Sequence, residues 1–444
     1  MPFLFEQFPT SGYPLLLYYS VGLVGISLLL LNPFYAFLLS VLGLSAKNFH
    51  AAILTRTEWA GPFLNLADLF FWIGIAAGLA KIIRSAKVRA MPAFFWVLCG
   101  LLLVAVGQSL YLYGFETFVL RNLWSVAIFP VSFFLSANMA AGERQAKSIY
   151  WALFAGATLA ALQHAVFLSG SAAAGVLAAH QLRTIAYISS GGMFLLVAAL
   201  FSRPPEGGGW ISKVYYLGLA LMALSFVMSQ TRQLYVSVSL VILVFLYLFR
   251  SKADFVKIFA RFLFIAAAIS VMFAYAYRDW SFSEIIGGRI ATLGERDSVV
   301  ESYSTRWMGM KTEFSMWENT LLVLGVGVAY PPEMTESYRE GDVFAYLDTG
   351  ALDHVAVTSY LAHYGLTGVL IYLGALPLFT FMRARGILAS APTPYAGKIA
   401  LLGLAISLFD FFNMFGSMPN TTVAAHIPGV IYGAVWGLRY GGKS

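Results

Sequence analysis

The sequence predicts an all-α polytopic membrane protein of about 12–13 transmembrane helices, with one large polar loop on the outer face that contains an amphipathic helix. Three observations lead to this prediction. The composition is 59% hydrophobic and only 11% charged, with a mean hydropathy of +0.76. Apolar runs of about 20 residues, long enough to cross a bilayer, recur along most of the chain. Residues 278–354, in contrast, have the composition of a water-soluble segment.

The apolar runs follow one another with short polar loops between them. The predicted spans are about 14–31, 33–46, 66–83, 92–113, 119–139, 149–169, 184–201, 211–229, 233–249, 257–277, 355–381, 397–415 and 423–440. Residues 14–46 form either a tight hairpin broken at Asn32–Pro33 or one crossing kinked there, because proline disrupts a helix interior. The hairpin gives thirteen spans and an outside N-terminus, whereas the single crossing gives twelve and an inside one.

Loop charges predict the orientation of these spans. Seventeen Lys and Arg residues, opposed by only three acidic residues, lie in five loops and the C-terminus: about 81–89, 140–148, 202–213, 250–261, 383–398 and 439–444. Cytoplasmic loops carry an excess of positive charge, so we expect this set to face the cytoplasm. Residues 278–354 carry thirteen acidic against six basic residues, a net charge of −7 in a chain of +7, and are expected on the outer face.

These features divide the chain into an N-terminal bundle (1–277), an outer loop domain (278–354) and C-terminal helices (355–444), which together form one integrated membrane unit. Within the loop domain, residues 302–322 predict an amphipathic helix that lies along the membrane surface with its aromatic face down. Its apolar side chains at helical spacing are Trp307, Met310, Phe314 and Trp317, and its polar ones are Arg306, Lys311, Glu313 and Glu318. Leu324-Gly325-Val326-Gly327 is expected to end the helix, because glycine permits the turn.

Three side chains on the outer face could carry chemistry: Arg232 in the short turn from Ser229 to Gln233, Arg306, and His354 at the start of a span. Taken singly, a boundary arginine is a snorkelling anchor and a surface histidine caps a helix. Taken together, they suit the displacement of a diphosphate from a lipid carrier by a hydroxyl group. Arginine binds phosphate oxygens bidentately, and histidine titrates near neutrality and can accept the proton.

The order of these motifs resembles the bacterial O-antigen ligase and O-antigen (exopolysaccharide) polymerase superfamily over about residues 215–380. Ser229-Gln230-Thr231-Arg232 is similar to the family's Ser-Arg turn. Ser304-Thr305-Arg306-Trp307 followed by Leu324–Gly327 resembles its Arg…Trp…Gly-x-Gly run. Asp353-His354 with Gly365-Leu366-Thr367-Gly368 resembles its His-Asn…Gly-Leu-x-Gly segment, although Val355 stands where the family has asparagine.

The resemblance implies a metal-independent, GT-C-like glycosyltransferase in the bacterial inner membrane, with its active site on the periplasmic face. The donor would be an undecaprenyl-diphosphate-linked glycan, and the acceptor a glycan, a lipid or a protein. Arg232 and Arg306 would hold the diphosphate, and His354 would be the base or the acceptor binder. Gln233, Trp307 and Asp353 would help to bind the substrate, with Asp353 beside the histidine in place of the asparagine.

Other classes are less favoured by the sequence. Metal-dependent relatives of this architecture place an acidic pair in the first outer loop, where this chain has only Glu58, so we expect no metal and no cofactor. The scattered Lys and Arg residues form no stripe, and we expect no nucleic-acid partner. A secondary transporter or flippase for lipid-linked glycans is the alternative, since Asp68, Gln163, His164, Asp410 and Asn413 lie within spans and could relay protons.

Overall fold

The residues that the structure describes form helices and short connecting segments, and none of these residues lies in a β-strand. The computed structural model describes residues 32–45, 66–85, 90–115, 117–140, 142–171, 190–205, 209–228, 232–250, 310–311, 313–318, 324–328, 356–390, 392–414 and 422–438, with single positions at 24, 258, 260 and 267. The helices are α3 (Pro33–Ser45), α5 (Leu66–Ser85), α6 (Ala93–Tyr113), α7 (Thr117–Met139), α8 (Glu143–Ser171), α10 (Ser190–Phe201), α11 (Trp210–Met228), α12 (Arg232–Leu248), α17 (Ala356–Val369), the π-helix η5 (Leu370–Ala375), α18 (Leu376–Ala389), α19 (Pro394–Phe412) and α20 (Thr422–Gly437).

These helices coincide with predicted spans, which confirms the helical part of the prediction for the described residues. Three stretches are long and apolar enough to cross a membrane: Ala93–Tyr113, Ala356–Ala389 and Pro394–Phe412. A helix does begin at Pro33, and Asn32 caps it, because Asn32 Oδ1 accepts a hydrogen bond from the Phe34 amide at 3.1 Å. The span predicted before Asn32 lies outside the described residues apart from Val24, and so does that at 257–277 apart from three positions.

Helices α7 and α20 approach each other closely along their backbones, and small residues explain it. Gly429, Gly433 and Gly437 recur every fourth residue along one face of α20. A Cβ on Gly429 or Gly437 would lie 2.7 Å from a carbonyl oxygen of α7, and one on Gly433 would collide with the Phe133 carbonyl. Such small-residue spacing lets two helix backbones meet at close range. The two helices are also joined by Ser136 Oγ, which donates to the Val430 carbonyl at 2.7 Å.

At one end of the bundle, charged side chains form hydrogen bonds to the ends of helices. We call it the Glu143 end (residues 142–150, 201–205, 209–215, 383–390, 392–398 and 436–438). Glu143 of α8 accepts hydrogen bonds from the Tyr395 amide at 2.8 Å and the Ala396 amide at 3.2 Å, which caps the start of α19. Arg383 donates to the carbonyls of Trp436 at 2.9 Å and Leu438 at 2.8 Å, which caps the end of α20.

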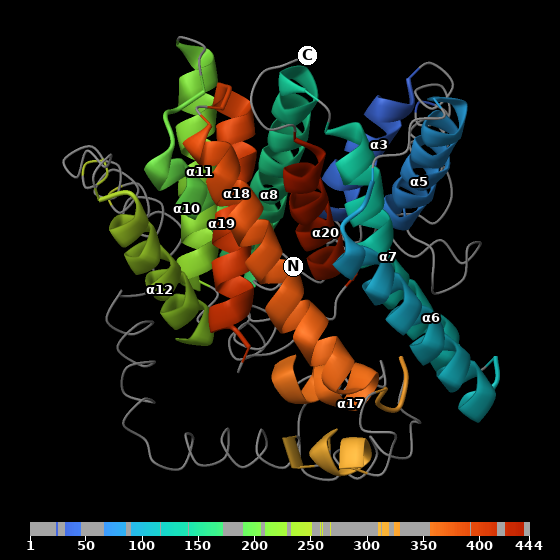
Figure 1. Ribbon diagram of the computed structural model, residues 1–444. Helices are drawn as coiled ribbons and strands as arrows, with labels where there is room; N and C mark the ends of the chain where they lie inside the picture. Colours follow the sequence, from blue (N-terminus) through green and yellow to red (C-terminus); the bar gives the residue numbers. More distant parts are fainter. Residues whose placement is uncertain are drawn as a thin grey trace, which may run out of the picture.

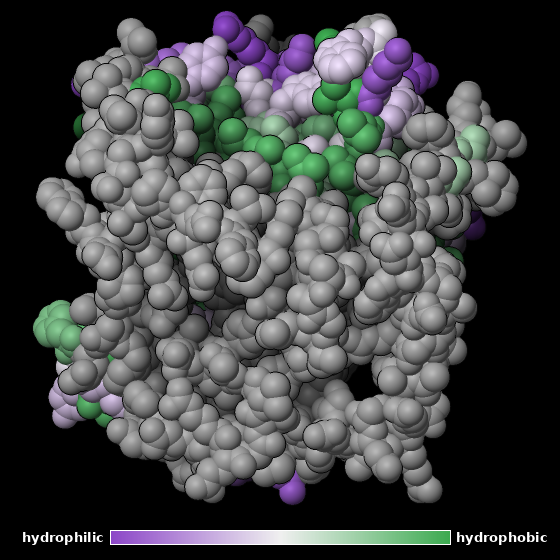
Figure 2. Space-filling model, turned by 180° about the vertical axis from the view of Figure 1, so that it is seen from behind, coloured by the Kyte–Doolittle hydropathy of each residue, from purple (hydrophilic) through white to green (hydrophobic). Residues whose placement is uncertain are grey.

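The buried lysine at the same end joins two further segments. Lys398 is 4% exposed, and its Nζ donates to Ser202 Oγ at 3.4 Å and to the Arg203 carbonyl, while it lies 5.5 Å from the centre of the Tyr150 ring. The described parts of three predicted cytoplasmic loops, near 140–148, 202–213 and 383–398, therefore meet at one end of the bundle. Seen from behind, hydrophilic side chains gather at this end, directly above a band of hydrophobic ones (Figure 2).

The opposite end is the Gly325 end (residues 105–115, 310–311, 313–318, 324–328, 356–366 and 409–414). In Figure 1, α17 and the short helical stretch within 310–318 lie at the bottom, away from the end where α8, α11 and α18 reach the top. The Val357 amide donates to the Met414 carbonyl at 3.0 Å, so the start of α17 and the end of α19 meet there. The described part of the polar loop thus lies at the end opposite to the gathered basic residues.

Candidate functional site

The loop Leu324–Val328 is held in a conformation that two glycines allow. Gly325 has φ +67° and Gly327 has φ +106°, in the left-handed region that side chains with a Cβ disfavour. The turn predicted at Leu324-Gly325-Val326-Gly327 is therefore confirmed. A Cβ at Gly325 would lie 2.6 Å from the His363 carbonyl carbon and 2.7 Å from the Gly365 nitrogen, so this loop lies directly against the backbone of α17.

The loop meets α17 where that helix is broken. Gly365 has φ 64° and ψ −165°, a conformation that interrupts the helix after its first nine residues. The Ala362 and His363 carbonyls accept hydrogen bonds from the amides of Val326, at 2.7 Å, and Gly327, at 3.0 Å. The loop therefore caps the C-terminal end of the first half of α17 with amides from another segment.

His363 completes this attachment from its side chain. It is 4% exposed, and its Nδ1 donates to the Gly327 carbonyl at 2.8 Å. Beyond the break, residues 366–389 form a continuous rod of about 24 residues and about 36 Å, enough to cross a hydrocarbon core of about 30 Å without the first half. Residues 356–364 are consequently available to build a site at the Gly325 end.

Helix α6 supports the same loop from the other side. Gln108 Nε2 donates to the Gly325 carbonyl at 2.8 Å, and the Val328 amide donates to Ser109 Oγ at 2.8 Å. A Cβ on Gly327 would lie 2.9 Å from the Ala105 carbonyl oxygen. Three segments far apart in the sequence, near residues 108, 326 and 362, are therefore locked together by hydrogen bonds with defined directions.

The helical stretch before the loop docks on α17 by a face that the sequence pattern assigned to solvent. Glu313 was expected among the polar side chains, but it is 0% exposed. Its Oε1 accepts a hydrogen bond from Ser359 Oγ at 2.7 Å, and its Oε2 accepts one from Thr358 Oγ1. Met316, one turn further on, packs against Ala362 and Val326.

The predicted aromatic face of this stretch is partly exposed. Phe314 is 42% exposed and its ring lies 5.1 Å from that of Trp317, while Met310 and Trp317 are half-buried. The exposed Phe314 ring agrees with the expectation that this helix lies on an apolar surface. Residues 302–309, 312 and 319–322 of the predicted helix lie outside the described residues.

The residues predicted to take part in the reaction are neighbours in sequence of the segments described above. Most of them lie outside the described residues. Arg232 and Gln233 are the first two residues of α12, and their side chains lie outside what the structure describes. Arg306, Trp307, Asp353 and His354 lie outside it altogether, so their predicted roles stay predictions. The boundaries at 277/278 and 354/355 lie outside it as well, and so do the side chains of Asp68, Gln163 and His164.

The predicted chemistry also raises the question of a metal site. Within the described residues, no three His, Cys, Asp or Glu side chains gather as metal ligands would. An acidic pair in the loop domain with the spacing of metal ligands, Glu295 and Asp297, lies outside these residues.

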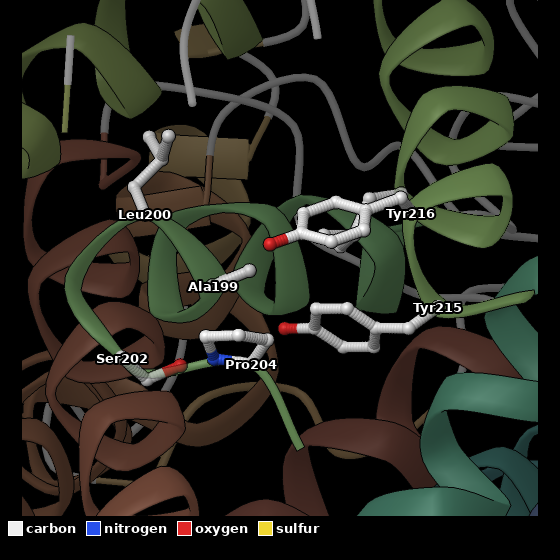
Figure 3. A pocket seen from close by; sticks show the side chains of 7 residues that line it. Ala199, Leu200, Ser202, Pro204, Tyr215 and Tyr216 are labelled. Atoms are coloured by element: carbon white, nitrogen blue, oxygen red, sulfur yellow. The ribbon is translucent and has the colours of Figure 1, made fainter. Parts of the chain in front are cut away.

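A small pocket lies at the Glu143 end, between α10 and α11. Figure 3 shows Tyr215 and Tyr216 side by side, with their hydroxyl groups directed toward Ala199, Ser202 and Pro204. Its volume is about 10 Å³, close to the space of a single water molecule. This pocket is therefore far too small for a sugar or a lipid diphosphate.

Comparison with known proteins adds no further evidence. No protein-family model matches the chain, and no curated protein matches it. Any functional conclusion therefore depends on the sequence motifs and on the geometry described above.

Proposed function

We propose that this protein is a polytopic inner-membrane glycosyltransferase that acts without a metal ion at the periplasmic face. It would move a glycan from an undecaprenyl-diphosphate carrier to an acceptor hydroxyl group, as an O-antigen ligase or a surface-polysaccharide polymerase does. The two activities share their chemistry and differ in the acceptor, which is a lipid or protein for one and another lipid-linked glycan for the other.

The observation that carries the proposal is the docking of the segment that follows Arg306 onto the segment that follows His354. Glu313, seven residues after Arg306, accepts hydrogen bonds from Thr358 and Ser359. Thr358 is four residues after His354, so the His354 Cα lies within about 15 Å of the Thr358 Cα, because consecutive Cα atoms are about 3.8 Å apart. The segments that follow the two motifs therefore meet at the Gly325 end, although almost fifty residues separate the motifs in the chain, and this contact supports the proposal.

The proposed residue roles follow from the chemistry of the transfer. The acceptor oxygen forms a bond to the anomeric carbon of the sugar, and the bond between that carbon and the diphosphate oxygen breaks. His354 accepts the hydroxyl proton, which its near-neutral titration allows. Arg232 and Arg306 stabilise the departing diphosphate by bidentate, charge-assisted hydrogen bonds. The polyprenyl tail stays in the lipid, so only the head group has to reach this end.

The distribution of charge supports the proposed orientation. Basic side chains gather at the Glu143 end, and the described part of the acidic loop lies at the opposite end. Under the positive-inside rule the Glu143 end faces the cytoplasm, which puts the Gly325 end in the periplasm. A lipid-linked donor would then meet the site at the outer surface of the membrane.

A release assay tests the proposal. Purified protein in lipid nanodiscs is incubated with an undecaprenyl-diphosphate-linked glycan and an acceptor, in the presence of EDTA, and free undecaprenyl diphosphate is measured. We expect acceptor-dependent release that added Mg²⁺ or Mn²⁺ does not increase. Absence of release across a panel of bacterial donors and acceptors would contradict the proposal, and release only with added metal would contradict its metal-independent form.

A transporter or flippase is the second candidate, because polar pairs lie within the helix bundle. Tyr432 OH of α20 donates to Asp410 Oδ2 of α19 at 2.6 Å, and Ser132 Oγ of α7 lies 2.7 Å from His426 Nδ1 of α20. Ionisable groups inside a membrane bundle mark proton pathways in many transporters. The hydrogen bond from Tyr432 satisfies one oxygen of the Asp410 carboxyl within the bundle, however, and this favours a structural role.

A further inference from the structure

Within the described helical stretch of 310–318, Glu313 stands apart from the other charged side chains. Lys311 and Glu318 are exposed, whereas Glu313 is 0% exposed. Burying a carboxylate costs several kcal/mol unless hydrogen bonds satisfy its oxygens, and each Glu313 oxygen has a hydroxyl donor. If the two segments only had to be held together, apolar side chains of similar size would do so at a lower free-energy cost.

The partners of Glu313 are consecutive residues in the first turn of α17. Thr358 and Ser359 are the third and fourth residues of that helix, and both side chains are buried. A negative charge is favourable there because the helix dipole is positive at its N-terminus. Hydrogen bonds to two neighbouring hydroxyl groups fix both the position and the rotation of α17 relative to the helical stretch, which a non-directional apolar contact such as Met316 with Ala362 does not do.

We propose that Glu313 is a positioning residue that sets the placement of the His354 side of the site relative to the Arg306 side. This inference rests on the proposed function. The carboxylate joins the first turn of α17, where Thr358 is four residues after His354, to the helical stretch that begins four residues after Arg306. A shift of about 1 Å between a base and the group that it serves can reduce a rate about 100-fold.

The informative variant is Glu313→Gln, which keeps the size of the side chain. It removes the charge and one of the two oxygens that accept hydrogen bonds from the Thr358 and Ser359 hydroxyl groups. The matched control is Glu318→Gln, the same substitution on the exposed side of the same stretch. For Glu313→Gln we expect kcat to fall 10- to 100-fold with the donor KM within about twofold of the wild type, because the arginines still hold the diphosphate. Glu318→Gln should leave both unchanged. Thr358→Val combined with Ser359→Ala should reproduce the effect, and adding Glu313→Gln to that pair should lower kcat little further.

A distance measurement keeps the inference testable if the variant is less stable or the wild type shows no transfer. Spin labels on Lys311→Cys and Leu366→Cys, both exposed positions, are introduced in a Cys99→Ala background. We expect one narrow distance distribution in the wild type and in Glu318→Gln, and a broadened or shifted one in Glu313→Gln.

The inference is overturned by an unchanged distance distribution in Glu313→Gln, or by kinetic constants equal to those of Glu318→Gln in an active protein. A fall in kcat that only follows the folded fraction also overturns it. No release by the wild type, with the distance result as expected, rejects the proposed function and leaves Glu313 as the residue that orients α17.

Discussion

Replacing Gly325 with alanine tests whether the loop Leu324–Val328 is held by close backbone contact with α17. A left-handed φ costs an alanine about 1–2 kcal/mol. The added Cβ would meet the backbone of Ala362, His363 and Gly365, none of which can rotate away. The loop must therefore move and lose three hydrogen bonds: Val326 to Ala362, Gly327 to His363, and Gln108 to the Gly325 carbonyl.

These losses are worth about 1 kcal/mol each, which brings the total to about 4 kcal/mol. Because about 1.4 kcal/mol corresponds to a tenfold change, the amides of Val326 and Gly327 should exchange with deuterium about 1,000-fold faster in Gly325→Ala than in the wild type. The measurement is hydrogen exchange by mass spectrometry on a peptide that contains residues 324–328, in protein reconstituted in nanodiscs.

Gly114→Ala is the matched control, because Gly114 has nearly the same φ, +68°, and an added Cβ there would meet no described atom within 4 Å beyond its own chain neighbours. This variant carries the conformational cost alone and should leave exchange at residues 324–328 unchanged. Equal losses of thermal stability in the two variants, with protection at Val326 retained in Gly325→Ala, would show that the close approach to α17 contributes nothing.

The proposed function leads to four further predictions. A cysteine at Ser337, in a Cys99→Ala background, should react with an impermeant thiol reagent in intact spheroplasts; labelling only after lysis would reverse the orientation. Arg232→Ala and Arg306→Ala should each reduce the rate of transfer at least 100-fold, and lysine at either position should restore it only in part. Arg84→Ala, at an exposed position, should leave the rate unchanged. Full activity of both Arg232→Ala and Arg306→Ala would mean that the two arginines are membrane anchors. The rate of transfer by the wild type should rise with pH through neutrality, because His354 must be neutral to accept a proton. His354→Gln should be about 10²–10⁴-fold slower, and its rate should not depend on pH in this range. Near-normal turnover in that variant would limit His354 to positioning the acceptor. Asp410→Asn keeps an acceptor for the Tyr432 hydroxyl, so the rate of glycan transfer should stay within about twofold of the wild type. Loss of a proton-coupled transport activity in this variant would favour the transporter.

The sequence was sufficient to predict where the described helices lie. Their apolar runs are long, and the loops between them are short and charged, so the boundaries of α6 and α11 fall within two residues of the predicted spans. The turn at Gly325 was also predictable, because two glycines in three residues allow a backbone that other residues disfavour. That the turn lies against the break at Gly365 was not, since its partners are backbone atoms with no residue signature.

The role of Glu313 could not be read from its own helix. Periodicity separates an apolar face from a polar one, but it does not say which face meets the rest of the protein. The partners of Glu313 are hydroxyl groups 45 and 46 residues further along, in a run that otherwise predicts a transmembrane helix. The glycines at 429, 433 and 437 are different, because their four-residue spacing is a recognised signal for close helix packing and was available in the sequence.

The break in α17 also explains why the polar loop and the helix that follows it depend on each other. A helix interrupted inside an apolar segment exposes carbonyl groups that lipid cannot satisfy. The Val326 and Gly327 amides satisfy two of them, those of Ala362 and His363. In return, the left-handed loop gains hydrogen bonds from Gln108 and His363 that offset its conformational cost. Neither segment has these partners without the other, so the candidate site should form only when both have folded, and variants at Gly325 or Glu313 should affect the placement of α17 before they affect the stability of the bundle.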